Sequence, residues 1–364
     1  MKKVLLIIFL LSILNYVKAQ ENSNEYKQIE FVKLNQSNDL FTYWFQSDKY
    51  FTDGVDIEFA HKIFNNKIAD KVLLGFDTKY KDYSLSFNQD MYTPANTQIT
   101  YIDSNDRPYA GQLYLTYSKF SNQFFKGRKL SSSLYVGIQG PASKAGESQN
   151  YVHSAINNPT AKGWDNQISN GLILDYEMQY MAMIPLYSPI NELHYFVNAH
   201  IGALNVSTEA GFRFKLGRYT DSYMNFYGIA NDRNNYNFSA VDISKMSKAR
   251  RKIIPKHLRS QSLQQQAEYL NKRMNRKFQF YFFTEGIVSY VAHDGSVEGS
   301  YIQFSDNIYE YNYADYEHSK LLGRYGFVFQ YSHFYLEYAR YLQNDTYKES
   351  GVFGYGKIIL SFVF

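Results

Sequence analysis

A glutamine and a histidine four residues apart are the side chains of this sequence best suited to chemistry. Gln149 and His153 lie between two clusters of helix-breaking residues, at 137–141 and 163–167. One turn of a helix would place both side chains on one face. An imidazole titrates near neutral pH, so a histidine on a short helix between two rigid loops can act as a general base. A solvated loop helix has the same spacing, so the rest of the chain must decide between the two interpretations.

Four further polar clusters come earlier in the chain, and each is a weak signal by itself. They are Ser37-Asn38-Asp39-Leu40-Phe41, Asp48-Lys49-Tyr50-Phe51-Thr52-Asp53-Gly54, Asp90-Met91-Tyr92-Thr93-Pro94 and Asn105-Asp106-Arg107-Pro108-Tyr109-Ala110-Gly111. Their meaning depends on the elements that position them.

The first residues have the pattern of a signal peptide. Lys2 and Lys3 are followed by an apolar run at 4–14, and a small residue, Ala19, precedes Gln20. We expect a signal peptide at 1–19 and a mature domain at 20–364. The sequence has no cysteine, which excludes a disulfide scaffold and cysteine-bound metals in the exported protein.

The remaining sequence alternates apolar and polar residues, the period of β-strands. The whole chain contains 36 Tyr and 28 Phe, yet its mean hydropathy is −0.43, as expected when only one face of each strand is apolar. The chain given also ends in an alternating segment, on Phe364. We predict an all-β fold, a transmembrane antiparallel barrel in the outer membrane. About twelve strands are expected, near 28–37, 53–63, 81–92, 108–119, 129–139, 167–184, 192–204, 206–216, 278–292, 320–331, 333–342 and 352–364.

Strand parity separates the loops. If the first strand rises from the periplasm, the connections 38–52, 93–107 and 140–166 lie at the external end. These three loops hold the polar clusters and the short helix with His153. A basic insertion at about 243–277, with a helix expected at 260–276, falls at the periplasmic end. It contains 11 Lys or Arg and a single acid, Glu268, and it is either a solvated insertion or a contact for anionic headgroups or the cell wall.

The clusters, taken together, resemble the lipid A 3′-O-deacylase (LpxR) family of outer-membrane barrels. The shared motifs are the Asn-Asp pair, the Tyr/Phe-Thr-x-Gly turn, the Tyr-x-Pro step, the Asp-Arg-Pro-Tyr-Ala-Gly string and Gln-x-x-x-His. They occur in the family's order from about Ser37 to Asp165, and beyond that only the strand pattern continues. The resemblance implies a calcium-dependent esterase that removes the 3′-linked acyloxyacyl group from lipid A, at a site opening laterally near the outer leaflet.

Carried over position by position, the family's functional residues fall on five positions of this chain. Asp39 would be the Ca²⁺ carboxylate and His153 the base that activates water. Asn38 would supply an amide donor to the oxyanion or a further oxygen ligand, while Thr52 and Gln149 would orient the water or the imidazole. The basic insertion is not part of the family's pattern.

The substrate contacts are less specific. Arg107, Lys49 and Lys144 are candidates for binding lipid A phosphates, although Arg107 is better explained as a loop anchor to Asp106 or Asp90. Trp164 is expected in the aromatic belt at the membrane interface. The expected partners are lipopolysaccharide and the outer membrane. We expect a monomer, and no nucleic-acid partner because the chain is exported and carries no matching motif.

Two other functions remain open. Calcium-dependent outer-membrane phospholipases activate a serine with histidine and asparagine, but no serine here lies in a comparable string. A non-catalytic barrel that keeps the deacylase loops is the third possibility. A porin would spread its charged residues through the lumen, whereas the special residues here gather in three external loops.

Overall fold

The computed structural model describes residues 28–38, 41, 50–103, 106–155, 157–186, 191–224, 237–309, 317–344 and 352–364, with Thr52 described by its backbone alone. The predicted signal peptide at 1–19 lies outside these residues.

Within these residues twelve antiparallel strands form a closed barrel, in which each strand pairs with its sequence neighbours and β12 pairs with β1. The strands are β1 (Phe31–Asn38), β2 (Tyr50–Ala60), β3 (Lys81–Thr93), β4 (Ala110–Gln123), β5 (Arg128–Gln139), β6 (Gly171–Ile184), β7 (Asn191–Gly202), β8 (Asn205–Arg218), β9 (Phe278–Asp294), β10 (Ser319–Tyr331), β11 (Phe334–Asn344) and β12 (Val352–Val363). The predicted fold is therefore confirmed, and every strand end lies within four residues of its expected position.

The alternation in the sequence corresponds to the two faces of the wall. In β12, Leu360 and Phe362 are 40% and 51% exposed, whereas Ile359 and Ser361 are buried. The outward residues form an apolar surface for lipid, and the inward residues line a polar lumen. No helix in the described parts of the chain is long and apolar enough to cross a membrane.

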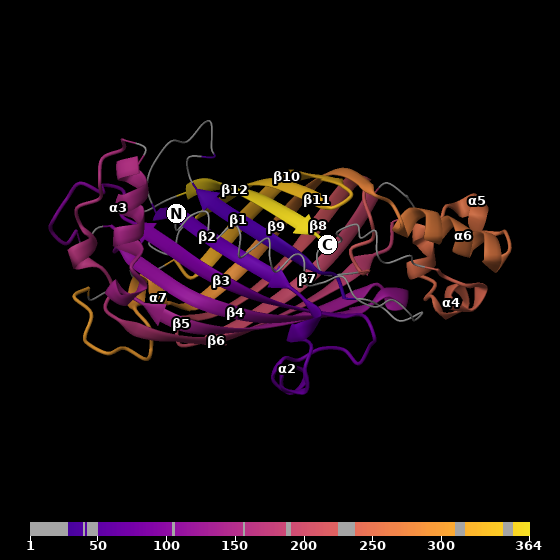
Figure 1. Ribbon diagram of the computed structural model, residues 1–364, viewed down its shortest axis with the longest axis horizontal. Coiled ribbons are helices and arrows are strands. Elements are labelled where there is room, and N and C mark those ends of the chain that lie inside the picture. The colour runs from indigo at the N-terminus through magenta and orange to yellow at the C-terminus, as the bar shows by residue number, and fades with distance from the viewer. Residues whose placement is uncertain are drawn as a thin grey trace.

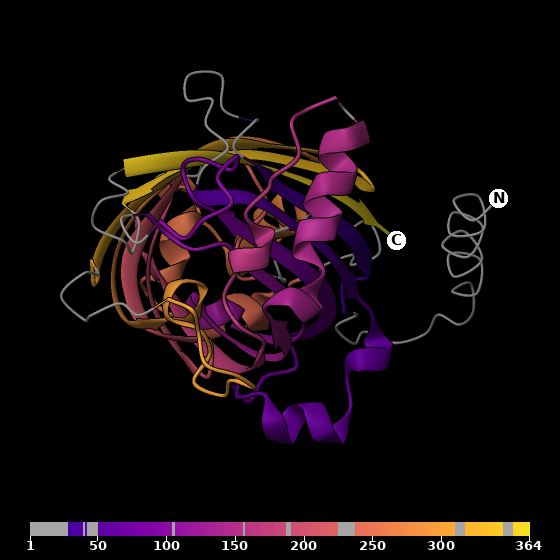
Figure 2. The ribbon, with the colours of Figure 1, turned by 90° about the vertical axis from the view of Figure 1, so that its left-hand side faces the viewer.

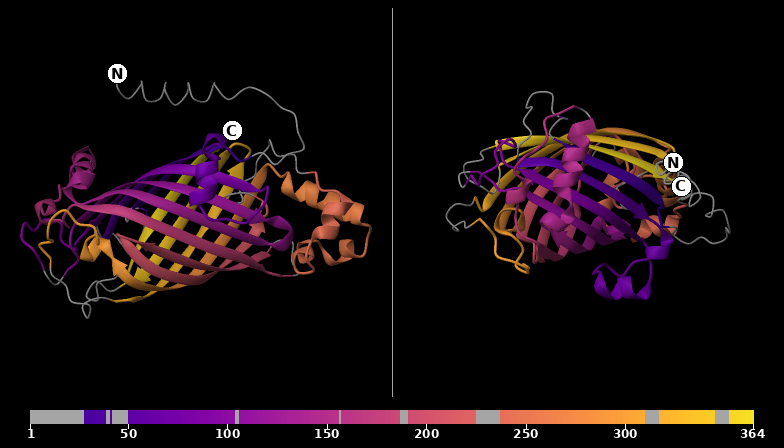
Figure 3. Two further views of the ribbon diagram at one scale, coloured as in Figure 1. Left: turned by 90° about the horizontal axis from the view of Figure 1, so that it is seen from below. Right: turned by 60° about the vertical axis from the view of Figure 1, so that its left-hand side comes forward.

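The helices gather at the two ends of the barrel (Figures 1 and 3). The end reached by β1, β3 and β5 is the external end by strand parity. It carries η4 (Pro141–Ser143), α3 (Ala145–Ala155), η5 (Trp164–Asn166) and α7 (Gly295–Glu298). The periplasmic end carries η2 (Lys62–Phe64), α2 (Lys67–Val72), η3 (Phe124–Lys126), α4 (Ala240–Lys245), η6 (Arg250–Ile253), α5 (Lys256–Arg259) and α6 (Leu263–Met274). The view along the barrel shows α3 across the rim and α2 outside the wall (Figure 2).

The basic insertion is an ordered subdomain beneath the barrel. A capping box formed by Ser262 and Gln265 begins α6, and Ala267 and Leu270 are fully buried on one face, as the apolar spacing predicts. These residues belong to an apolar cluster that includes Phe124, at the turn between β4 and β5. The insertion is therefore attached to the barrel by its own hydrophobic core.

Arg250 joins the subdomain to the barrel. Its fully buried guanidinium pairs with the buried carboxylate of Asp221, and its Nε donates to the Phe124 carbonyl oxygen over 2.8 Å. It also stacks on the Phe124 ring, 4.4 Å from the centroid. Residues 219–224 are all buried next to this contact, so the chain that leaves β8 helps to close the periplasmic end of the lumen.

Candidate active site

The buried face of α3 carries the two side chains singled out by the sequence. Gln149 is 4% exposed and His153 is 6% exposed, so the prediction that they share one face of a short helix is confirmed. Gly146 lies on the same face, where an added Cβ would come within 2.7 Å of the Trp164 ring. The helix therefore packs closely onto the loop that follows it, and this contact fixes where its polar side chains point.

His153 is held in a defined tautomer. Its Nδ1 lies 2.7 Å from the carbonyl oxygen of Pro159. A carbonyl oxygen only accepts, so Nδ1 carries the proton and donates it. Nε2 makes no hydrogen bond within the described residues and is left as the acceptor. This is the tautomer that a general base acting through Nε2 requires.

Gln149 is oriented by Trp164. The indole Nε1 donates to Gln149 Oε1 over 2.7 Å, and because an indole N–H is only a donor, the amide orientation follows. The Nε2 of Gln149 is then a buried donor without a hydrogen-bond partner in the described structure. Such a group is costly unless a ligand supplies the acceptor. Gln149 is thus placed to donate to an oxygen beside His153.

The prediction that Trp164 is a membrane-belt residue is wrong. Its side chain is 7% exposed, and its ring packs against Tyr109 with centroids 4.9 Å apart. Met91, Ala145 and Ala161 complete this cluster. An indole buried on one side and hydrogen-bonded on the other is a structural support for the α3 face.

The motifs of the first two loops lie on one level of the barrel wall. The strand registers pair Asn38 with Asp53, Asp53 with Met91, and Met91 with Gly111. Paired residues share a face, and neighbouring strands are roughly 4.8 Å apart. This row of residues faces outward. Asn88 and Asp90 of β3 line the lumen cavity, and Met91, next to Asp90, points to the opposite face of the strand.

The row leads to the candidate helix. Met91 packs against Ala145, at the start of α3, and Gln89 on the same outer face donates to the Ser143 carbonyl oxygen over 2.8 Å. A Cβ on Gly111 would collide with Ser143 and Ala145, which explains why glycine ends the Asp-Arg-Pro-Tyr-Ala-Gly string. Asn38 and the α3 face therefore lie on the outer side of the same stretch of wall.

A β-bulge marks the predicted Thr52 position. The pairing of β2 with β3 skips Thr52 between Phe51 and Asp53, and such bulges are common beside active sites, where they redirect side chains. The side chain of Thr52 is outside the description, and so are Asp39 and Lys49 in full. Their predicted roles remain predictions.

Asp53 is a functional candidate that the sequence analysis did not select. The side chains of Asn38 and Gln36 hydrogen-bond to its carboxyl group, while its Oδ1 is buried with no hydrogen-bond partner in the described structure. The residue was visible in the Tyr/Phe-Thr-x-Gly turn, but its significance depends on the register that places it opposite Asn38.

These groups fit a calcium ion chemically. Asn38 carries an amide oxygen, and the Oδ1 of Asp53, which has no hydrogen-bond partner in the described structure, adds a carboxylate oxygen. Oxygen donors of this kind suit Ca²⁺. The described residues contain no group of three or more His, Asp or Glu side chains placed to hold a metal, and Asp39 lies outside them.

The three predicted phosphate contacts have different surroundings. Arg107 is 2% exposed, lies over the Tyr92 ring at 4.6 Å and donates to Ser296 Oγ of α7 over 2.9 Å. These are contacts of a loop anchor, and the backbone N–H of Arg107 also donates to Asp106, one of the two partners expected. Lys144 lies on the exposed surface before α3 and pairs with Glu147 at 2.8 Å, and this hydrogen bond lowers the pKa of Glu147.

Asp106 holds the loop that leads to Arg107. Its carboxylate accepts from the backbone N–H groups of Ala95 at 2.6 Å and Arg107 at 2.8 Å. Burial raises the pKa of Asp106 in spite of these bonds. This acid therefore organises the 94–107 loop beneath the α3 site.

A closed twelve-stranded barrel with an apolar outer surface and a polar lumen is an integral membrane protein of the outer-membrane class. The family model described as outer membrane protein LpxR matches residues 5–364. The chain belongs to this family, and the protein is located in the outer membrane.

A solved structure of the family supports the same fold. LpxR from Salmonella typhimurium is 14% identical to this chain, with a TM-score of 0.64, and the match covers 92% of this chain and 100% of that one. The beta domain of the Bordetella autotransporter Brka is 8% identical with a TM-score of 0.39, covering 93% of this chain and 100% of that one, which is a much weaker likeness. At such identities the likeness shows the fold alone. No curated protein matches the sequence.

Proposed function

We propose that this protein is an outer-membrane esterase that removes the 3′-linked acyloxyacyl group from lipid A. The observation that carries the proposal is the α3 face, where His153 has an acceptor Nε2 and Gln149 has an unsatisfied donor. Ser143 and Ala145, next to this face at the start of α3, pack on outward residues of β3 and β4, so the proposed approach of the lipid substrate is from the leaflet. Membership of the LpxR family supports lipid A as the substrate.

In the proposed mechanism His153 Nε2 removes a proton from a water molecule as the water oxygen attacks the ester carbonyl carbon. The hydrogen bond from Nδ1 to Pro159 holds the ring in place during this transfer. Gln149 Nε2 donates to the carbonyl oxygen while it gains negative charge. The imidazolium then protonates the departing sugar oxygen, which leaves a free fatty acid and a hydroxyl group on the sugar.

Calcium, bound by Asp39 with oxygen atoms from Asn38 and Asp53, would polarise the ester carbonyl and offset the charge of the oxyanion. Asn38 and Asp53 lie opposite one another on neighbouring strands. Thr52, at the bulge, would orient the attacking water. Lys144, on the exposed surface next to α3, is placed to contact a phosphate group of the substrate, whereas Arg107 is engaged with Tyr92 and Ser296.

The test is the mass spectrum of lipid A from cells that produce the protein, compared with cells that produce His153→Ala at equal abundance in the outer membrane. The proposal predicts loss of one acyloxyacyl mass with the parent protein and unchanged lipid A with the variant. Unchanged lipid A in both strains, with both barrels folded, would contradict the proposal.

A further inference from the structure

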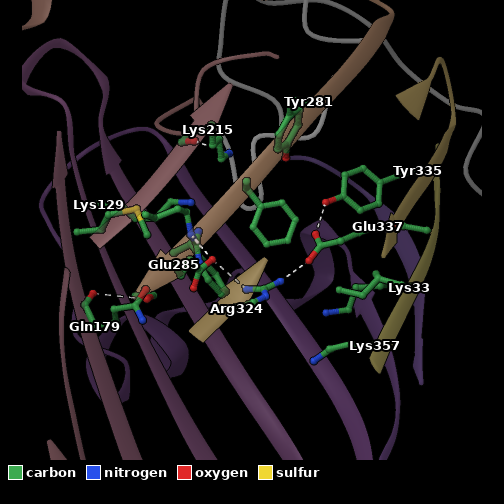
Figure 4. Close-up of a pocket in the computed structure, with 18 of the residues that line it drawn as sticks. Lys33, Lys129, Gln179, Lys215, Tyr281, Glu285, Arg324, Tyr335, Glu337 and Lys357 are labelled. Atoms are coloured by element: carbon green, nitrogen blue, oxygen red, sulfur yellow. Dashed lines mark hydrogen bonds and ion pairs between the residues drawn. The ribbon is translucent and has the colours of Figure 1, made fainter. Parts of the chain in front are cut away.

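The lower part of the barrel lumen contains a cavity of about 210 Å³ whose walls are rich in cations. Six basic side chains and two acidic ones line it, and they come from seven strands. The basic residues are Lys33, Lys129, Arg213, Lys215, Arg324 and Lys357, and the acidic ones are Glu285 and Glu337. In Figure 4, Lys33 and Lys357 approach from one wall and Lys129 and Lys215 from the other, around Arg324.

Both glutamates of the cavity form ion pairs with arginines. Glu285 pairs with Arg213 at 2.7 Å and with Arg324 at 3.2 Å, and Glu337 pairs with Arg324. The second oxygen of Glu337 accepts from the Tyr335 hydroxyl over 2.7 Å. The acids that line the cavity are therefore engaged, and Lys33 is paired with Glu58, just outside the lining.

Two lysines of the same cavity have no ion pair within the described residues. Lys215 is 5% exposed; its Nζ donates to Ser222 Oγ over 2.8 Å and lies 4.8 Å from the Tyr281 ring centroid. Within the described residues, the hydrogen bonds of Lys215 reach a carboxylate only indirectly: the Ser222 hydroxyl accepts from Lys215 and donates to Glu192 over 2.9 Å. Lys357 makes neither a hydrogen bond nor an ion pair in the described structure.

Arg213 adds free donors to the same space. Its Nε is bound to Glu285, but its two terminal nitrogens make no hydrogen bond within the described residues, although Arg213 lines the cavity. A planar guanidinium with unused nitrogens beside ammonium groups is suited to an anion with several oxygen atoms. Uncompensated cations in a mostly buried space are unfavourable unless an anion accompanies them.

We propose that this cavity binds a small tetrahedral oxyanion of the phosphate type. The volume has room for on the order of ten water molecules, so it accommodates a hydrated phosphate. Arg213, Lys215 and Lys357 are the anion's ligands, and they connect β8 to β12 across the lumen. The site is separate from the α3 face, which lies on the outer side of the wall.

Equilibrium dialysis of the full-length protein against radiolabelled inorganic phosphate tests the proposal. The protein is kept in a non-ionic detergent. A chelator removes calcium, and added chloride salt holds the ionic strength constant. The expected result is saturable binding of about one phosphate per chain, displaced by sulfate. The double variant Lys215→Gln/Lys357→Gln should bind at least tenfold more weakly.

The matched control is Lys256→Gln/Lys272→Gln, which removes the same charge from the exposed surface of α5 and α6. This pair should bind phosphate as the parent does; equal loss in both pairs would place the binding on the basic subdomain and overturn the proposal. If the lumen variant does not fold, the melting temperature of the parent protein is measured with and without phosphate instead. Phosphate should raise the melting temperature above that in chloride at equal ionic strength, and identical melting temperatures would overturn the proposal.

Discussion

The two ends of this barrel carry helices for different purposes. At the external end α3 presents His153 and Gln149, with one acceptor and one donor left unused. At the periplasmic end α4 and α6 form an apolar core, and Arg250 and Asp221 satisfy each other's charge. The proposed chemistry uses the external end, where an unused acceptor and an unused donor share one helix face, whereas the periplasmic end packs its helices on an apolar core.

Removal of calcium should have the largest effect on the external end. With a chelator in excess we expect lipid A turnover to fall below detection, because in the proposed mechanism Ca²⁺ would offset the charge of the oxyanion. The barrel should stay folded, since strand pairing closes it without an ion. Turnover is measured by mass spectrometry and folding by heat-dependent gel mobility. Adding Ca²⁺ back to the chelated sample should restore activity and is the control. Full turnover in a metal-free sample would rule out the calcium role.

Arg250→Met should have the largest effect at the other end. It leaves the fully buried Asp221 without its cation, and removing one partner of a buried pair costs about 3–5 kcal/mol of stability. We expect unfolding at lower urea concentration, with unchanged turnover per folded molecule. Adding Asp221→Asn should recover part of the loss. A folded Arg250→Met protein without activity would break the distinction between the two ends.

Gln149→Ala should lower kcat by about 10²-fold, the usual effect of losing one donor to an oxyanion, and should leave KM nearly unchanged. Trp164→Phe is its matched control, because it keeps an aromatic ring but removes the hydrogen bond that orients Gln149. We expect a loss of about fivefold there, as for one neutral hydrogen bond. Steady-state kinetics on purified lipid A separates the two; equal losses would show that Gln149 acts only through packing.

The smallest effect concerns α2 and pH. Burial favours a higher pKa for Asp70, but the hydrogen bonds from Lys119 at 2.6 Å and Tyr83 at 2.5 Å hold it at about 2. Its unfolded value is about 3.9, so its contribution to stability is present above pH 4 and is lost as the pH falls towards 2. As the pH falls over this range, the rate of amide hydrogen exchange in α2, relative to the intrinsic rate of an unfolded chain, should rise. Asp70→Asn should remove this pH dependence. An unchanged pH profile in the variant would show that other groups hold α2.

Alternation was sufficient to predict the strands, because one polar and one apolar face per strand leave a period that the sequence displays directly. The barrel was predicted from this period together with the signal-peptide pattern and the abundance of aromatic residues. The spacing of Gln149 and His153 was equally sufficient for their shared helix face. Asp53 could not be selected in this way, since its importance depends on strand register and on hydrogen bonds from Asn38 and Gln36.

The sequence also did not predict that the basic insertion folds around a hydrophobic core. Charge suggested a solvated segment, but its core is assembled with Phe124, Tyr223 and Phe238, which lie in other parts of the chain. Trp164 was misplaced for a similar reason. A tryptophan in a membrane protein is often interfacial, and its contacts with Gln149 and Tyr109 exist only after α3 has folded back onto its loop.

The most direct test of the central claim is the turnover of lipid A by purified His153→Gln beside the parent protein, with both shown to be folded barrels. His153→Gln keeps a polar side chain of similar size but has no imidazole to take up the proton. We predict a fall in kcat of about 10²–10⁴-fold, the usual contribution of a general base. Undiminished turnover by the variant would contradict the assignment of the chemistry to the α3 face.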